Sequence, residues 1–315
     1  MAGTASGRLP WDSVPDHVRN DVETLLGARV VAAATQPGGF SPGVAARLRL
    51  DDGSRAFVKS AGPAPNPDTP GIHRAEARIA AALPGTAPVP RLLGSFDRAG
   101  WVTLVFEDID GRHPREPWDA AELDRVLDAL VRLASSMTPA PIDAPTAGER
   151  FGASFRGWRR LAAGGDLTGL DPWARRNLAR LAALEDAWED AAAGTTLAHA
   201  DVRADNILLT GDRVVIVDWP WACLAAPWFD LVAMLPSVHL QGGPSPADVF
   251  GAHPLARGAD EEAVTSVVAA VAGYFVHAGR QPPPPGLPSL RAFQRDQGEV
   301  ALDWLRRRME SSPLR

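Results

Sequence analysis

Apolar residues in the first third of the chain fall mostly in short runs, which is typical of β-strands. Turns rich in glycine, proline and aspartate separate these segments. The strands expected on this basis are 30–35, 44–50, 55–60, 89–96 and 101–106. Helical spacing of apolar residues occurs instead at 16–26 and 72–83. The pattern therefore predicts an antiparallel sheet with a helix beside it.

From about residue 109 the apolar spacing becomes mainly helical. The expected helices are 120–138, 171–188, 230–238, 260–277 and 290–308. Apolar character stops at 107–111, which predicts a hinge whose backbone N–H and C=O groups, at Glu107 and Ile109 for example, could bind adenine. The sequence thus predicts an α+β fold with an N-terminal lobe, residues 1–108, and a mainly helical C-terminal lobe, residues 109–315.

Composition narrows the class of protein further. Of the 315 residues, 45% are apolar and 22% charged, as in ordinary globular proteins. No stretch approaches the ~20 apolar residues of a membrane span, and no signal-peptide pattern opens the chain. The single cysteine, Cys223, allows no intrachain disulfide, and a net charge of -6 argues against general nucleic-acid binding. We therefore expect a cytoplasmic monomer or homodimer that binds neither nucleic acid nor membranes.

The segment 197–218, LAHADVRADNILLTGDRVVIVD, places a polar loop between short apolar strands. His-x-Asp-x-x-x-x-Asn, followed by a hydrophobic strand that ends in Asp, is the arrangement that phosphoryl transfer from ATP requires. Asp201 would orient the acceptor hydroxyl and accept its proton. Asn206 and Asp218 would hold Mg²⁺, which prefers hard oxygen ligands. The alternative interpretation of this segment alone is a surface hairpin with polar tips.

Lysine usage adds a separate clue. Of the 32 basic residues, 31 are arginine and one is lysine, Lys59, on the strand expected at 55–60. Because an ammonium and a guanidinium differ in reach and geometry, the lone lysine marks a place where arginine does not serve, unless it survives by chance. Arg55, on the same strand, is expected to hold no partner. Three glycines of the preceding loop would let the backbone approach phosphates closely: Gly38, Gly39 and Gly43.

Glu76 lies 17 residues after Lys59, on the helix expected at 72–83. A carboxylate on a helix beside the sheet could pair with Lys59 and hold it toward nucleotide phosphates. The alternative is an exposed helix carboxylate near Arg74 and Arg78. A strand, a glycine-bearing loop and a strand with its lysine together predict a phosphate-binding lobe.

These residues resemble the aminoglycoside phosphotransferase family, small-molecule kinases that share the bilobal protein-kinase-like fold. The resemblance spans roughly residues 30–305 and is strongest at HADVRADN, 199–206, and VIVDW, 215–219. It implies that Lys59 holds the α- and β-phosphates of ATP with Glu76 as its helix partner. It also implies that Asp201 is the catalytic aspartate, and it places two residues at the Mg²⁺ ligands, Asn206 and Asp218.

Other positions near this motif have expected supporting roles. His199 resembles the histidine that braces the loop, and Asp230 could cap its helix or brace the same loop. The family usually has Gly where Ala200 stands. Arg203 departs from the family's usual His or Asn; a role in stabilising the charge of the transferring phosphate and a salt bridge to Asp205 are both open.

A small-molecule acceptor is favoured over a protein. Too few residues separate Asp218 from Asp230 for the long activation segment of a protein kinase. From residue 112 onward, 26 acidic residues face 21 arginines, which favours a cationic acceptor such as an aminoglycoside. Three aromatic residues could form an acceptor wall or instead pack the core: Trp219, Trp221 and Trp228.

Several interpretations stay open at this point. The family also includes kinases of sugars, choline-like alcohols and homoserine, so the acceptor hydroxyl is not fixed. A catalytically silent nucleotide-binding scaffold of the same fold is a second hypothesis, although it has no need for all of the predicted site residues. A metal-dependent hydrolase is a third, and it needs neither Lys59 nor an adenine hinge.

Overall fold

The computed structural model describes residues 8–36, 43–64, 66–284 and 289–311. Packing divides the chain into two compact units. The first unit is Met1–His113 with Asp205–Trp221, and the second is Pro114–Ala204 with Ala222–Arg315. The boundary between His113 and Pro114 lies close to the expected hinge at 107–111. Residues 205–221, which we expected in the C-terminal lobe, instead pack with the first unit.

The hairpin of β7 (Ile207–Leu209) and β8 (Val214–Ile216) explains this return. Leu209 forms an antiparallel bridge with Arg112, and the N–H of Ile216 donates to the carbonyl of Pro88 over 2.7 Å. Backbone groups buried in a protein need such partners, so these bonds fasten the hairpin to the first unit.

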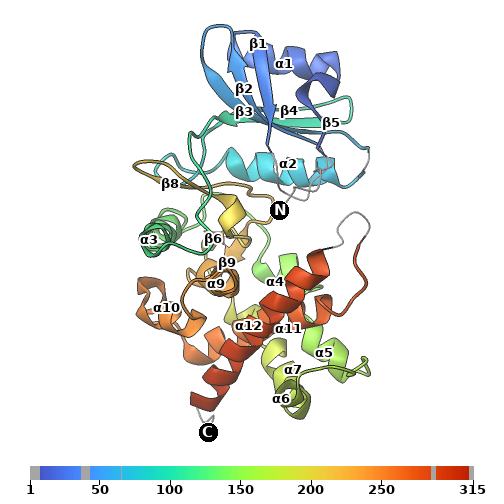
Figure 1. Ribbon diagram of the computed structural model, residues 1–315, viewed down its shortest axis with the longest axis vertical. Coiled ribbons are helices and arrows are strands. Elements are labelled where there is room, and N and C mark those ends of the chain that lie inside the picture. Colours follow the sequence, from blue (N-terminus) through green and yellow to red (C-terminus); the bar gives the residue numbers. More distant parts are fainter. Residues whose placement is uncertain (1–7, 37–42, 65, 285–288, 312–315) are drawn as a thin grey trace. The chain divides into compact units, whose positions relative to one another are not determined.

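The first unit contains a five-stranded antiparallel sheet in the order β1-β2-β3-β5-β4 (Figure 1). Its strands are β1 (Val30–Thr35), β2 (Val44–Leu50), β3 (Arg55–Ala61), β4 (Leu92–Arg98) and β5 (Trp101–Glu107). The expected strands are confirmed. β4 begins three residues later than expected, because Pro90 has no N–H to give to the sheet.

One helix packs on each face of this sheet. α1 (Asp16–Leu26) contributes Val18 and Val22 to a core with Ala46, Leu48, Ala56 and Val58. α2 (Thr69–Ala80), the helix expected beside the sheet, packs through Ala77 and Ala80 on the other face, with Phe57, Leu104 and Phe106. Successive side chains of a strand point to opposite faces, so Lys59 shares the α2 face with Phe57.

The second unit is mainly helical, as expected. Its helices are α3 (Ala120–Ser136), α4 (Ala147–Phe151), α5 (Gly157–Ala162), α6 (Pro172–Arg176), α7 (Leu178–Asp186), α8 (Trp188–Ala191), α9 (Phe229–Leu240), α10 (Pro246–Ala252), α11 (Glu261–Ala278) and α12 (Leu290–Ser311). β6 (Thr196–Ala198) pairs antiparallel with β9 (Cys223–Ala225). α11 contacts α5, α7, α8, α9 and α12 and forms the centre of the unit. Within the described ranges, no helix combines the length and apolarity needed to cross a membrane.

Several local features of the second unit differ from the prediction, among them the division of one helix and the presence of α4. The helix expected at 171–188 is divided into α6, α7 and α8, and the side chain of Asn177 donates to the carbonyl of Trp173 at the first break. Such side-chain bonds compete with helix continuation. α4 was not predicted, because five residues are too few to show periodicity; a capping box of Thr146 and Glu149 begins it.

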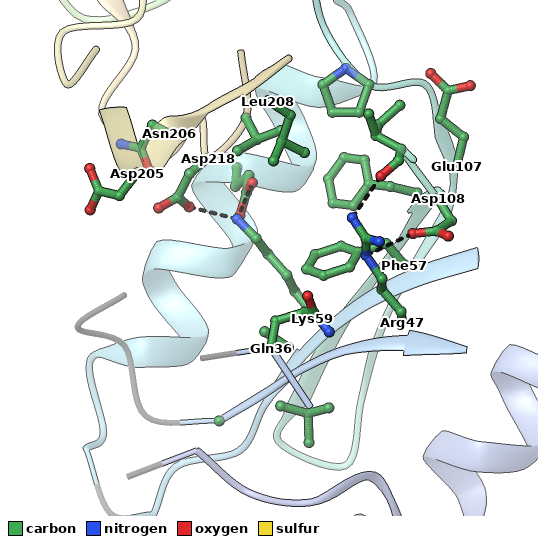
Figure 2. A pocket seen from close by; sticks show the side chains of 18 of the residues that line it. Gln36, Arg47, Phe57, Lys59, Glu107, Asp108, Asp205, Asn206, Leu208 and Asp218 are labelled. Atoms are coloured by element: carbon green, nitrogen blue, oxygen red, sulfur yellow. Dashed lines mark hydrogen bonds and ion pairs between the residues drawn. The ribbon is translucent and has the colours of Figure 1, made fainter. Parts of the chain in front are cut away.

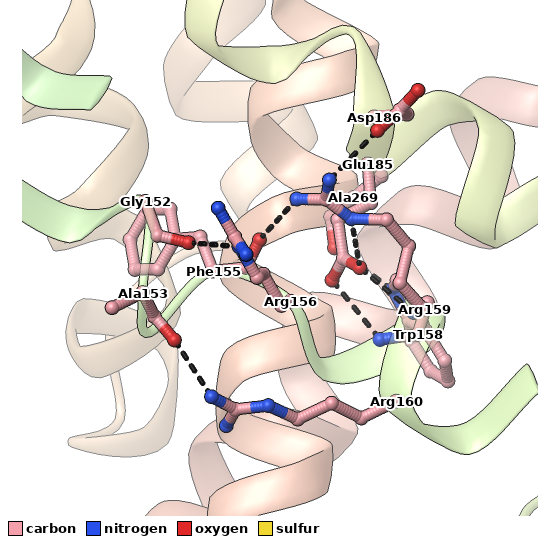
Figure 3. A network of polar contacts seen from close by, with 10 residues as sticks. All are labelled: Gly152, Ala153, Phe155, Arg156, Trp158, Arg159, Arg160, Glu185, Asp186 and Ala269. Atoms are coloured by element: carbon pink, nitrogen blue, oxygen red, sulfur yellow. Dashed lines mark hydrogen bonds and ion pairs between the residues drawn. The ribbon is translucent and has the colours of Figure 1, made fainter. Parts of the chain in front are cut away.

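A buried carboxylate, Glu185, organises the packing of α5, α7 and α11 (Figure 3). It accepts the backbone N–H groups of Trp158 and Arg159 over 3.0 and 2.9 Å, so it satisfies two donors at the start of α5. Burial raises the pKa of Glu185, although these donors and the Arg159 guanidinium oppose the shift. Gly157 lies where α5 approaches α11, and a Cβ there would collide with the carbonyl oxygen of Gly273.

Replacing Glu185 with Ala is expected to lower the free energy of unfolding by about 3 kcal/mol, because two buried N–H groups lose their acceptor and a cavity remains. Asp186→Ala is the matched control, since Asp186 pairs with the same Arg159 but is exposed, and it should cost less than about 1 kcal/mol. Urea unfolding of the two variants measures the difference. Equal losses would show that Glu185 is not a structural anchor.

Candidate active site

The first unit encloses a cavity of about 320 Å³ on the α2 face of the sheet (Figure 2). Two neighbouring strands line the cavity with side chains from alternate positions. These are Ala45 and Arg47 on β2 and Phe57 and Lys59 on β3. Figure 2 shows Lys59 pointing toward Asp218, whereas Arg47 points toward Asp108. The cavity therefore has one end built around Lys59 and another beside the segment after β5.

Lys59 lies between two carboxylates. Its Nζ is 2.7 Å from Oε1 of Glu76 and 2.6 Å from Oδ1 of Asp218. The expected ion pair of Lys59 and Glu76 is thus present, and Glu76 is buried rather than exposed. Burial alone would lower the pKa of Lys59, but Asp218 and Glu76 outweigh it and raise that pKa above its usual value. Lys59 therefore carries a fixed positive charge into the cavity.

Asn206 and Asp218 line the same end of the cavity. The carbonyl of Asn206 accepts the N–H of Val217 over 2.9 Å, which brings the two segments together. Asp218 follows β8 with φ +73°, a left-handed conformation that aspartate tolerates better than most residues. One amide oxygen and one carboxylate suit Mg²⁺, which takes few protein ligands and completes its shell with phosphates and water. No group of three or more His, Cys, Asp or Glu side chains in the described ranges forms a self-sufficient metal site.

Aromatic rings and the segment 107–109 form the other end of the cavity. Phe57, Phe106, Glu107 and Ile109 all line it. The carbonyl of Ile109 accepts a hydrogen bond from the Arg47 guanidinium over 2.7 Å. The N–H of Ile109 forms no hydrogen bond within the described residues, so it is a donor available to a ligand. The Glu107 carboxylate accepts the N–H of Arg91, so it holds the end of β5 to the segment before β4.

Arg47 and Asp108 were not predicted as site residues. Nε of Arg47 lies 3.2 Å from the buried Asp108 carboxylate, which also accepts Nε of Arg55 over 2.6 Å. The expectation that Arg55 holds no partner is therefore wrong, because the turn after β5 brings Asp108 beside β3. The face on which Arg47 lies could have been inferred from strand alternation. Arg47 lies opposite Phe57, and Phe57 is two positions before Lys59 on the same face of β3.

The loop at 199–203 belongs to the second unit and is fastened by Asp230, the second residue of α9. The N–H groups of His199 and Ala200 donate to the two Asp230 oxygens over 2.8 and 2.7 Å. The N–H of Asp201 donates to Nδ1 of the buried His199 over 3.1 Å. Burial raises the pKa of Asp230, while His199 and these donors hold it down. Both residues thus fix the backbone that presents Asp201.

Arg203 contacts Asp201, with Nε 3.5 Å from Oδ1. Its guanidinium also lies 6.0 Å from the centre of the Phe293 ring. Ala200 has φ +66°, a conformation that costs a residue with a Cβ about 1 kcal/mol and costs glycine almost nothing. That conformation explains why the family usually has glycine at this position.

Two of the three tryptophans proposed as an acceptor wall are buried. Trp219 and Trp228 are 1% and 6% exposed, and the indole N–H of Trp219 donates to the carbonyl of Ile216. Both are buried, which is the alternative that the sequence left open. Trp221 is 40% exposed and keeps surface that a ligand could contact.

Of the three glycines predicted to cover phosphates, Gly38 and Gly39 lie outside the described residues. Gly43 has φ +133°, and a Cβ there would come within 2.7 Å of the carbonyl oxygen of Ser60. It lines the cavity where β2 begins, so only glycine fits this close approach.

This protein has the kinase-like fold. Its features are a sheet that carries a Lys–Glu pair, an Asn–Asp pair and a braced His-x-Asp loop. The chain belongs to the phosphotransferase enzyme family (APH), whose family model matches residues 37–265. It is therefore a small-molecule phosphotransferase. A comparison with curated proteins found no match.

Solved structures share this fold at low identity. A thermostable mutant of aminoglycoside phosphotransferase APH(4)-Ia, in ternary complex with ADP and hygromycin B, is 14% identical, with a TM-score of 0.58 over 95% of this chain and 99% of that one. A choline/ethanolamine kinase family protein from Mesorhizobium loti is 18% identical, with a TM-score of 0.57 over 94% of each chain. An aminoglycoside phosphotransferase from Alicyclobacillus acidocaldarius is 16% identical, with a TM-score of 0.54 over 92% and 96%.

Lys59→Arg tests whether the lone lysine is required. The wider guanidinium should misplace the positive charge between Glu76 and Asp218, and displacement by about 1 Å at such a site is costly. We expect a folded protein with kcat/KM reduced by at least about 10-fold, equivalent to about 1.4 kcal/mol of transition-state stabilisation.

Arg49→Lys is the matched control for this measurement. Arg49 is exposed on β2 and forms no ion pair within the described residues, whereas Arg55 is excluded as a control by its contact with Asp108. Equal kcat/KM in the two variants would mean that Lys59 is an accident of codon usage.

Proposed function

We propose that this protein transfers the terminal phosphoryl group of ATP, with Mg²⁺, to a hydroxyl of a small molecule. The observation that carries the proposal is the position of Lys59, held between Glu76 and Asp218 at one end of a cavity whose other end is aromatic and offers the Ile109 N–H. A nucleotide needs these two environments, one for its phosphates and one for its base.

Each residue then has a defined part. Lys59 binds the α- and β-phosphates, and Glu76 fixes its direction. Asn206 and Asp218 hold Mg²⁺, which when bound neutralises phosphate charge. Phe57 and Phe106 flank the adenine, whose edge accepts the Ile109 N–H.

Asp201 acts on the acceptor. It orients the hydroxyl and takes its proton as the new phosphate ester forms. His199 and Asp230 position its backbone and touch no substrate. Arg203, paired with Asp201, supplies positive charge beside the reacting groups.

Local charge bears on the acceptor class. Burial raises the pKa of the Tyr274 hydroxyl, and the charges that act on it are those of Asp201, Arg203 and Arg291. One turn along α11, the charges that act on His277 are all arginines: Arg160, Arg280 and Arg291. These arginines offset part of the acidic excess of residues 112–315, so cationic, neutral and anionic acceptors all belong in the test.

A panel of acceptors tests the proposal. Aminoglycosides, neutral sugars, choline-like alcohols and hydroxy acids are each incubated with the enzyme and Mg-ATP, and ADP release is measured. We expect acceptor-dependent release with at least one of these classes. Release that no acceptor stimulates would favour a hydrolase, and ATP binding without release would favour a silent scaffold.

A further inference from the structure

Arg8 lies beside the cavity at the end that holds Lys59. Its backbone forms a parallel bridge with Gly43, and the N–H of Leu9 donates to the carbonyl of Gly43 over 2.9 Å. These bonds fix the segment along the start of β2. The Arg8 side chain lines the same cavity as Lys59 and Asp218.

Electrostatic effects on two groups, Arg8 and His73, agree with this position in the cavity lining. Burial lowers the pKa of Arg8, and the Asp218 carboxylate opposes that shift. Burial, Lys59 and Arg8 together lower the pKa of His73 to about 4. His73 is therefore neutral at pH 7, and its Nδ1 donates to the carbonyl of Thr69. Arg8 and Lys59 are the two cations that act on it.

The charges at this end favour a further protein cation besides the proposed Mg²⁺, because Mg-ATP is itself an anion. The single positive charge of Lys59 faces the two carboxylates of Glu76 and Asp218, so this trio has a negative sum. A triphosphate would add further negative charge beside it. Arg8 balances the trio, and its planar fork can donate two hydrogen bonds to one phosphate group, which an ammonium cannot do in the same geometry.

We propose that Arg8 binds the phosphate chain of the nucleotide, as a second cationic ligand from the segment that precedes the sheet. This inference deepens the proposed function and rests on it, because it assigns a ligand-binding residue to the same cavity. Lys59 holds the nucleotide from β3, and Arg8 holds it from the Gly43 side. Neither the lysine usage nor the glycine loop pointed to Arg8 in the sequence.

Calorimetric binding of adenosine, Mg-ADP and Mg-ATP to the wild type and to Arg8→Gln tests this inference. We expect Arg8→Gln to raise the Kd of Mg-ADP and Mg-ATP by at least about 10-fold, because the charge-assisted bonds to phosphate are lost. The Kd of adenosine, which has no phosphate, should change by less than about 2-fold. The Kd values of Arg8→Lys for Mg-ADP and Mg-ATP should lie between those of the wild type and Arg8→Gln, since lysine keeps the charge but lacks the planar fork.

Arg49→Gln serves as the control, because Arg49 is an exposed arginine of β2 and does not line the cavity. Its Kd values should match those of the wild type. Mg-ATP binding by Arg8→Gln at the wild-type Kd overturns the inference, as does an equal loss for adenosine and Mg-ATP, which would show a purely structural role. If the wild-type protein binds none of the three ligands, the proposed function is wrong, and this inference is wrong with it.

Discussion

Replacement of Asp201 with Asn is expected to lower kcat by about 10²–10⁴-fold while the Kd of Mg-ATP stays within about threefold. An amide keeps the size of the side chain and its place next to Arg203, but it cannot accept the proton of the acceptor hydroxyl. His199 and Asp230 contact the backbone of the loop, so the fold around residue 201 should be unchanged. Steady-state kinetics with an acceptor identified in the panel measures the effect.

Asp212→Asn is the control for this variant. Asp212 lies in the turn between β7 and β8 and accepts a hydrogen bond from Thr210, away from the proposed chemistry. Its kcat should equal that of the wild type. If Asp201→Asn also keeps near-normal turnover, the assignment of Asp201 as the catalytic base is wrong.

Asp218→Ala is expected to abolish the contribution of Mg²⁺ to nucleotide binding and to lower turnover by at least about 10³-fold. The variant removes the one carboxylate proposed to hold the metal and leaves Lys59 paired with Glu76 alone. In the wild type, Mg-ATP at 100 times its Kd should stabilise the folded protein by about 2.7 kcal/mol.

Thermal unfolding with and without Mg²⁺ and ATP checks this expectation. The Asp218→Ala protein should gain little more from Mg-ATP than from ATP alone. A Mg-ATP shift in Tm equal to that of the wild type would place the metal ligand elsewhere.

Local sequence patterns were sufficient for most of the fold. Short apolar runs bounded by turn residues located all five strands of the sheet, and helices on both faces explain why their apolar positions do not strictly alternate. The Lys59–Glu76 pair followed from residue types on two predicted elements, and the structure confirms that contact. Similarly, the position of Asp230 at the head of a helix predicted either a helix cap or a brace for the loop, and the structure shows the brace.

Contacts between distant segments account for what the sequence missed. Arg55 and Asp108 are 53 positions apart, and nothing in either segment indicates that they meet. The packing of β7–β8 with the first unit depends on backbone bonds to Arg112 and Pro88. Those bonds do not depend on side-chain type, so no residue pattern records them.

Burial of aromatic residues also escaped local patterns. Trp219 and Trp221 are two positions apart, yet the first is 1% exposed and the second 40%. Trp219 donates its indole N–H to the Ile216 carbonyl, a contact that no local pattern indicates. Residue type and position after Asp218 made both of them candidates for an acceptor wall.

The central claim is that the phosphoryl group leaves ATP for a carbon-bound hydroxyl rather than for water. Mass spectrometry of a reaction with Mg-ATP and the best acceptor of the panel tests this directly, with Asp201→Asn run in parallel. We predict an acceptor that gains one phosphate in equal amount to the ADP formed, and a product that is nearly absent with Asp201→Asn. ADP formed with inorganic phosphate alone, or a phosphorylated acceptor formed equally by both proteins, would contradict the account.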